Sequence, residues 1–222
     1  MIKLVEIKKH FTVSDNGKPR QIEVLKNINL HVSSGEYVSI KGKSGSGKST
    51  LLNIIGLLDA PSGGEFFLDG EKIDTLKDCS FYRQKYLGFI FQSYHLMNSL
   101  TVRENLELPL IYRNQKIDGA VINTLSENFQ IDHLLNNKAV NLSGGEKQRV
   151  AIARAMATSP EIIICDEPTG NLDDENTNIV LDAFDKLKAQ GKTLILVTHS
   201  DKVAEKADTH YLLEDGGLIK YD

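Results

Sequence analysis

The sequence has little of what disulfide-rich, membrane-spanning or secreted proteins depend on. It contains two cysteines, Cys79 and Cys165, whose separation matches neither a disulfide framework nor a metal site. We therefore expect free thiols in a reducing compartment. The longest apolar runs, such as residues 162–165, fall far short of the ~20 residues that cross a bilayer. Charges interrupt the first six residues, so we expect no secretory signal there. These absences predict a soluble, cytoplasmic protein that would act on a membrane only through a partner.

Positive charge is not in excess either. The 26 Lys and Arg residues against 30 Asp and Glu residues give a net charge of −4. Proteins that bind nucleic acid usually carry a basic face and often a basic total, so we expect no nucleic-acid partner. A composition that is 41% hydrophobic and 25% charged is typical of globular proteins and excludes a disordered or fibrous chain. The length of 222 residues suits one large domain, or one domain with a subdomain.

Strand and helix patterns alternate along most of the chain. Strands are predicted at residues 4–11, 22–32, 37–41, 65–68, 87–91, 162–165 and 193–197. Helices are predicted at 49–58, 102–112, 120–129, 145–158 and 174–190, with a turn at 14–19 and a hairpin around 215–217. Strand signals are sparse between about 72 and 141, which indicates a helical subdomain. The alternation elsewhere predicts an α/β fold with a mostly parallel sheet and helices on its faces.

The strongest motif is a glycine-rich loop at residues 42–50, which fits G-x-x-x-x-G-K-[ST] between a predicted strand and a predicted helix. Glycines allow successive N–H groups to face one anion, and the start of the helix adds its dipole. Lys48 would bridge two phosphates, and the Ser49 hydroxyl would ligate Mg²⁺. The predicted phosphate-binding residues are Gly42, Ser44, Gly45, Ser46, Gly47, Lys48, Ser49 and Thr50.

Four polar residues follow other predicted strands, where ligands bind in open α/β sheets. Asp166 is placed to hold Mg²⁺, and Glu167 to act as general base on water beyond the terminal phosphate. The side-chain carbonyl of Gln92 is able to ligate a metal or accept from water. His199 is able to contact the terminal phosphate or the attacking water, although a lone histidine after a strand is more often structural.

A second glycine motif precedes the helix predicted at 145–158. Ser143 and Glu146 form an S-x-x-E capping box, which explains both residues without any ligand. Gly144 and Gly145 are less well explained by capping, and they leave the helix start accessible to an anion. One phosphate site does not need two such helix starts, whereas two chains that share each nucleotide do. Asp173 lies where a loop leaving the acidic pair would cross to a neighbouring chain.

In this order and at this spacing, the motifs resemble those of the ATP-binding subunit of ATP-binding cassette (ABC) transporters. Residues 42–49 look like the Walker A loop, and residues 162–166 look like the Walker B strand. Gln92 matches the Q-loop, residues 142–146 match the signature motif, and residues 171–173 match the D-loop. Glu167 matches the catalytic glutamate and His199 the switch histidine. Phe11 matches the aromatic residue that stacks on adenine, which is most often Tyr in the family, and Glu146 replaces a common Gln.

This resemblance implies an ATPase that uses ATP and Mg²⁺. The metal would lie on Ser49, Gln92 and Asp166. ATP would drive homodimerisation, with Ser143, Gly144, Gly145 and Asp173 of one chain contacting the ATP held by the other. The resemblance covers the whole chain and implies one domain, residues 1–222. In it, a core with a β-subdomain at about 1–71 and 159–222 carries an inserted helical subdomain at about 72–158.

Residues 57–59, 87–92, 104–110 and 166–173 look like those of the MacB/LolD type. That resemblance implies export or extracytoplasmic mechanical work of the antimicrobial-peptide, macrolide, bacteriocin or lipoprotein type. The work would pass through a separate membrane permease, contacted by residues 93–101, with the ATPase peripheral at the cytoplasmic face. The alternatives are a cell-division-type ABC ATPase that regulates a cell-wall hydrolase, and a non-transport ABC ATPase. Three other classes fit less well. ABC ATPases of DNA repair carry long insertions and those of translation carry two cassettes, neither of which this sequence has. A P-loop kinase would have no role for Ser143 and Glu146.

Overall fold

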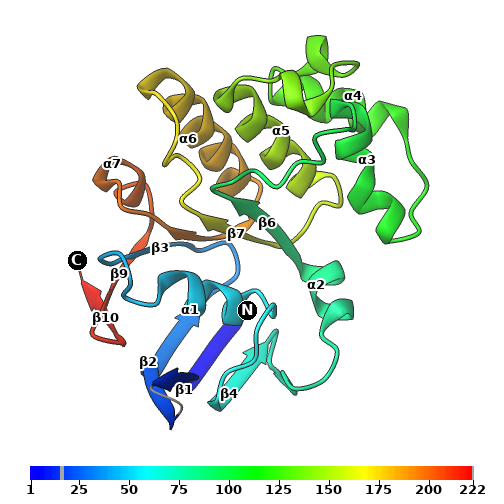
Figure 1. Cartoon of the computed structure of the whole chain (residues 1–222). Helices are drawn as coiled ribbons and strands as arrows, with labels where there is room; N and C mark the ends of the chain where they lie inside the picture. Colours follow the sequence, from blue (N-terminus) through cyan, green and yellow to red (C-terminus); the bar gives the residue numbers. More distant parts are fainter. Residues whose placement is uncertain (16–17, 222) are drawn as a thin grey trace.

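The computed structural model describes residues 1–15 and 18–221 and contains two β-sheets (Figure 1). The turn predicted at 14–19 lies partly outside the described residues. The smaller sheet has the strand order β2-β1-β4-β5, and each of its pairings is antiparallel. Its strands are β1 (Ile2–Asp15), β2 (Lys18–Val32), β4 (Gly63–Leu68) and β5 (Glu71–Ile73).

The larger sheet has six strands in the order β10-β9-β3-β8-β7-β6. Its strands are β3 (Tyr37–Lys41), β6 (Leu87–Phe91), β7 (Ile162–Asp166), β8 (Thr193–Val197), β9 (Thr209–Glu214) and β10 (Gly217–Tyr221). All neighbours pair in parallel except β9 and β10, which form the closing hairpin. The predicted α/β class is therefore confirmed, with a mostly parallel sheet and an antiparallel sheet beside it.

Helices cover both faces of the larger sheet. They are α1 (Lys48–Ile55), α2 (Ser80–Tyr86), α3 (Val102–Tyr112), α4 (Gly119–Asn128), α5 (Gly144–Met156), α6 (Asp174–Ala189) and α7 (Asp201–Ala204). Two short 3₁₀ turns, Asp132–Leu134 and Ala139–Asn141, lie between α4 and α5. In Figure 1, α5 and α6 lie on one side of β7, and α1 lies on the other side with the antiparallel sheet. None of the helices in the described ranges has the length and apolar character needed to span a bilayer.

The side chains of β7 separate two hydrophobic cores. Ile163 and Cys165 belong to the core that contains α3, α4, α5 and α6, whereas Ile162 and Ile164 belong to the core that contains α1 and the antiparallel sheet. Successive side chains of a strand point to opposite faces, so a strand covered on both faces must be apolar throughout. This requirement explains why the apolar run at residues 162–165 predicts its strand from sequence alone.

The elements that the sequence did not predict are short. β5 and α7 are too brief to show a periodic pattern, and the seven residues of α2 include none that is fully buried. The prediction for the first helix, 49–58, was wrong at its end. The helix stops at Ile55 because Leu57 has a left-handed backbone (φ 55°).

Candidate functional site

The register of the larger sheet aligns the ends of four strands. Phe91 pairs with Asp166, and Asp166 pairs with Val197, which in turn pairs with Ile40. The residues that follow these four strands therefore leave the sheet at one edge, where the glycine-rich loop also begins. A pocket of about 420 Å³ opens there. Its lining residues are Val24, Ser44, Gly45, Gly47, Lys48, Ser49, Thr50, Gln92, Asp166, Glu167 and His199.

The glycine-rich loop wraps around the Lys48 side chain. The Lys48 Nζ donates to the carbonyl oxygens of Gly42 (2.7 Å) and Lys43 (3.0 Å), and the side chain is buried. Gly47 has φ +100°, and a Cβ there would lie 2.9 Å from the Val24 side chain, so only glycine fits. Gly47 caps α1 without a side-chain hydrogen bond. The first N–H groups of α1 thus face the pocket with a buried ammonium beside them, an arrangement suited to phosphate.

Ser49 and Asp166 lie together at the pocket floor, where the Ser49 Oγ donates to the Asp166 Oδ2 over 3.3 Å. Two adjacent oxygen ligands of an octahedral Mg²⁺ lie about 3 Å apart, so this pair fits such an ion. Burial raises the pKa of Asp166, while the hydrogen bond from Ser49 and the charges of Lys48 and His199 oppose the rise. Among the described residues, no cluster of three His, Cys, Asp or Glu side chains forms a metal site. The exposed Gln92, water and phosphate oxygens would have to complete the ligand set.

Glu167 and His199 lie side by side in the pocket lining. The His199 Nε2 lies 3.0 Å from the Glu167 Oε1, and the His199 backbone N–H donates to Oε2 over 3.1 Å. Glu167 is buried and has a left-handed backbone (φ 46°), which is unusual for a residue other than glycine. Its N–H is held by the Val197 carbonyl at 2.9 Å. This strained position aims the carboxylate into the pocket, where it is able to accept a proton from water.

The residues predicted to contact a nucleotide of another chain lie outside this pocket. Ser143 caps α5, and its N–H and Oγ both donate to the Glu146 Oε2, which lowers the pKa of Glu146. Ser143 and Gly144 are exposed. Gly145 is buried, and a Cβ there would overlap the side-chain amide of Asn176. Packing within the chain is therefore a sufficient reason for glycine at position 145.

Asp173 caps α6 and is tied to the same neighbour. It accepts from the Asn176 backbone N–H at 2.8 Å, and the bonds from Asn176 lower the pKa of Asp173. The Asn176 Nδ2 lies 2.9 and 3.1 Å from the two carboxylate oxygens of Asp173, and the Arg149 Nη1 donates to the Asn176 Oδ1 at 2.8 Å. Sequence reasoning missed Asn176. The only signal for it was the D-x-x-N spacing at a helix start.

The segment after Gln92 is hydrogen-bonded to the C-terminal end of α5. Tyr94 and His95 both have left-handed backbones (φ 61° and 47°). Their carbonyl oxygens accept from the Arg154 guanidinium at 2.8 and 2.5 Å. The Tyr94 hydroxyl also lies 3.3 Å from the position that a Cβ on Gly144 would take. Sequence reasoning missed Arg154 and its contact with Tyr94, which it had placed only within the 93–101 segment, because no local pattern relates residues 60 positions apart.

Phe11 is not part of the pocket lining. It pairs with Ile22 across β1 and β2, and the two side chains are 42% and 44% exposed on the same face. The Lys9 Nζ lies 5.1 Å from the Phe11 ring centroid. Ile22 lines a neighbouring cavity that also borders the loop at Ser44, Gly45 and Ser46. The Phe11 face thus lies near that cavity, and its contact with a base remains a prediction.

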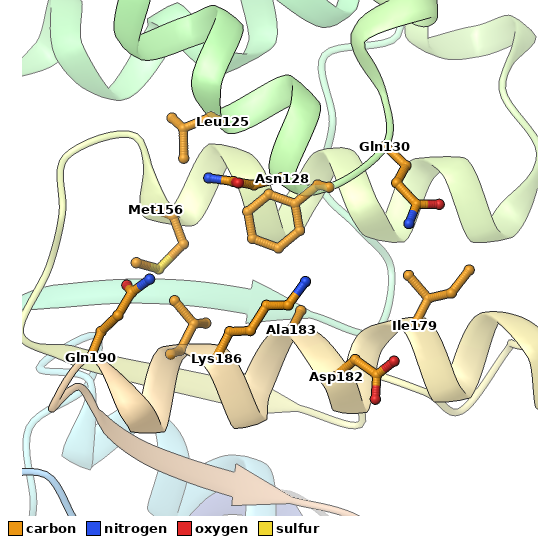
Figure 2. Close-up of a pocket in the computed structure, with 11 residues that line it drawn as sticks. Leu125, Asn128, Gln130, Met156, Ile179, Asp182, Ala183, Lys186 and Gln190 are labelled. Atoms are coloured by element: carbon orange, nitrogen blue, oxygen red, sulfur yellow. The ribbon is translucent and has the colours of Figure 1, made fainter.

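A separate cavity of about 190 Å³ lies between α6 and the end of α4 (Figure 2). Buried Met156 and Ala183 contribute to its wall, and Lys186 extends across it while Asp182 points away. It is lined by none of the predicted site residues. It therefore has no part in the phosphate chemistry described above.

Comparisons with known proteins bear on this geometry. The family described as "ABC transporter" matches residues 25–170. The chain is 40% identical over 224 residues to the lipoprotein-releasing system ATP-binding protein LolD 1 of Rhodopseudomonas palustris, covering 98% of each chain. It is 41% identical over 227 residues to the macrolide export ATP-binding/permease protein MacB of Brucella melitensis, covering 99% of this chain. The alignment covers only 34% of that MacB, so the chain spans about a third of it.

Solved structures share the fold. A dimeric structure described as a post-hydrolysis state of the ATP-binding cassette MJ0796, bound to ADP and Pi, matches with a TM-score of 0.88. The two sequences are 39% identical, and the alignment covers 99% of this chain and 98% of that one.

The pKa of Asp166 leads to a prediction about stability in the absence of ligand. Because folding raises this pKa, the ionised carboxylate destabilises the fold above the folded-state pKa, and this penalty is absent below about pH 4. Asp166→Asn should therefore be at least as stable as the wild type at pH 7 in EDTA, with the advantage gone at pH 4. Urea unfolding at both pH values measures this.

Asp173→Asn is the matched control with the opposite sign. Folding lowers the pKa of Asp173, so its ionised form stabilises the fold at neutral pH and this contribution disappears as the pH falls. Asp173→Asn should lose stability at both pH 7 and pH 4, because the contribution disappears only as the pH falls through the lowered folded-state pKa, below about pH 4. If Asp166→Asn instead behaves like Asp173→Asn, the buried carboxylate of Asp166 is not destabilising.

Proposed function

The chain belongs to the ABC transporter family, and from this premise we propose that it is the ATP-hydrolysing subunit that powers a membrane permease. It is an ABC ATPase of the LolD and MacB type, as its motifs predicted. One observation carries the proposal. The loop lysine, the Ser49–Asp166 pair, Gln92, Glu167 and His199 line a single pocket at the sheet edge.

The glycine-rich loop would hold the phosphates of ATP. The Lys48 ammonium, which donates to the carbonyl oxygens of Gly42 and Lys43, would instead donate to phosphate oxygens held by the same loop. The N–H groups at the start of α1 add further donors. Ser49 and Asp166 would hold Mg²⁺ with Gln92 nearby, and the ion would supply positive charge against the phosphates. Adenine would stack on Phe11 beside Ile22.

Glu167 would act as the general base. Its carboxylate is buried next to the pocket and accepts a hydrogen bond from the His199 N–H, and the His199 ring lies 3.0 Å from its other oxygen. A water between Glu167 and the terminal phosphate would give its proton to the carboxylate as it attacks. His199, whose side chain is 56% exposed, would orient Glu167 and contact the phosphate.

The exposed start of α5 would complete the site of a second copy. The pocket of this chain is not lined by Ser143, Gly144, Gly145 or Asp173. Ser143 is the N-cap of α5, and Asp173 is the N-cap of α6. Both helix starts would thus contact ATP held by the partner, as the dimeric form of MJ0796 supports. ATP would then be part of the interface, and hydrolysis would release the dimer.

The permease would be a separate chain contacted by residues 93–101, with the ATPase at the cytoplasmic face. The relatives support work of the export or lipoprotein-release type, because their names include a macrolide export ATP-binding/permease protein and a lipoprotein-releasing system. Substrates of the antimicrobial-peptide, macrolide, bacteriocin or lipoprotein type would be selected by the permease.

The first test is Glu167→Gln. The amide cannot take a proton, so phosphate release should fall by about 10²–10⁴-fold while ATP binding remains. With ATP and Mg²⁺, the variant should elute as a stable dimer in gel filtration. Phosphate release near the wild-type rate would refute the role of Glu167.

The second test is Ser143→Arg, made in the Glu167→Gln background. The large cation would occupy the start of α5 and should block ATP-driven dimerisation. Thr101→Arg is the matched control, because Thr101 and Glu104 form the same capping box on α3, away from the proposed contact. Dimerisation that survives Ser143→Arg, or fails equally with Thr101→Arg, would contradict a shared site.

The third test is purification of the tagged chain from its native membranes in mild detergent. A polytopic membrane protein should co-purify in near-stoichiometric amount, and it should be lost when residues 93–101 are replaced by a Gly/Ser segment. Recovery of ribosomes or DNA instead would contradict a transport role.

A further inference from the structure

Asn176 lies between the two elements that we assign to the partner's ATP. Its side-chain nitrogen donates to both carboxylate oxygens of Asp173, at 2.9 and 3.1 Å. Its side-chain oxygen accepts from Arg149, which is on α5, at 2.8 Å. One planar amide thus bonds to the cap of α6 at one end and to α5 at the other.

The same amide packs against the start of α5. The space that a Cβ on Gly145 would occupy is filled by the Oδ1, Cγ and Nδ2 atoms of Asn176. Gly145 directly follows the exposed Ser143 and Gly144. The backbone at the start of α5 and the carboxylate of Asp173 are therefore both in contact with one half-buried side chain.

We propose that Asn176 is a positioning residue that fixes Asp173 relative to the start of α5, so that both meet the ATP of the partner in one geometry. This inference rests on the shared site proposed above. Asn176 does not line the pocket around Lys48, so it does not touch the nucleotide of its own chain. Its contribution would be preorganisation: the two helix starts would not need to be ordered when the dimer forms.

The key variant is Asn176→Asp, which keeps the shape of the side chain. The new carboxylate still accepts from Arg149, but it faces the carboxylate of Asp173 without a proton to donate and repels it. Asn178→Asp is the matched control, since it adds the same charge on the same helix at an exposed position. Asn176→Ala is the second variant, because it removes the amide without adding charge.

Dimerisation is measured in the Glu167→Gln background by sedimentation with ATP and Mg²⁺. We expect the protein concentration at half-maximal dimerisation to rise at least tenfold in Asn176→Asp and Asn176→Ala and to stay unchanged in Asn178→Asp. Binding of a fluorescent ATP analogue to the monomer should stay within twofold of the parent in all three. A residue with a merely structural role would change monomer binding and the melting temperature along with dimerisation.

Ser143→Arg is measured alongside. If it blocks dimerisation while both Asn176 variants dimerise like the parent, the positioning role is wrong and the shared site stands. If Ser143→Arg also dimerises normally, the shared site itself is wrong. If the Asn176 variants weaken monomer binding as strongly as dimerisation, the residue supports the fold rather than the contact.

Discussion

The parallel pairing of β6, β7 and β8 is the constraint on which the rest of the site depends. In this register Phe91, Asp166 and Val197 are neighbours, so the residues that follow them leave the sheet side by side. The pairing is held by apolar side chains on both faces of β7, which are fully buried. A slip by one residue would turn every β7 side chain to the opposite core and move Asp166 away from Ser49. Packing far from the pocket thus fixes the distances inside it.

The pocket gathers charges that are only partly satisfied without a ligand. The Lys48 ammonium turns back onto carbonyl oxygens of its own loop, and Asp166 receives a single long hydrogen bond from Ser49. The strained backbone of Glu167 keeps a third charged group nearby. Such a set of charges costs stability unless further partners neutralise it, since buried charges need partners. A triphosphate is complementary in charge to Lys48, and a divalent cation is complementary to Asp166, so a chain of net charge −4 needs no overall positive charge to bind a polyanion there.

The sequence predicted the parts of this arrangement that arise from local rules. The apolar period marked the buried strands, and the glycine spacing marked the loop before α1. Strand ends marked Gln92, Asp166, Glu167 and His199, because a parallel sheet brings its carboxyl ends to one edge. Asn176 and Arg154 were missed because their partners lie on other elements. The reason for glycine at position 145 could not be predicted either. A Cβ there would overlap the Asn176 amide on α6, and no local sequence pattern indicates that contact.

These long-range contacts make α5 the element that joins the two surfaces proposed to face nucleotide. At its start, Gly145 packs on Asn176, which bonds to Asp173. Near its end, Arg154 bonds to the segment after Gln92, a residue of the pocket lining. A helix of three to four turns is stiff along its axis, because each turn is fixed by several hydrogen bonds. A change at Gln92 that moves the Tyr94–His95 backbone must therefore either break the two hydrogen bonds to Arg154 or shift α5 with it. The capping box at Ser143 alone would not connect the start of α5 to the pocket. The contacts of Gly145 with Asn176 and of Arg154 with Tyr94 connect both through one stiff helix.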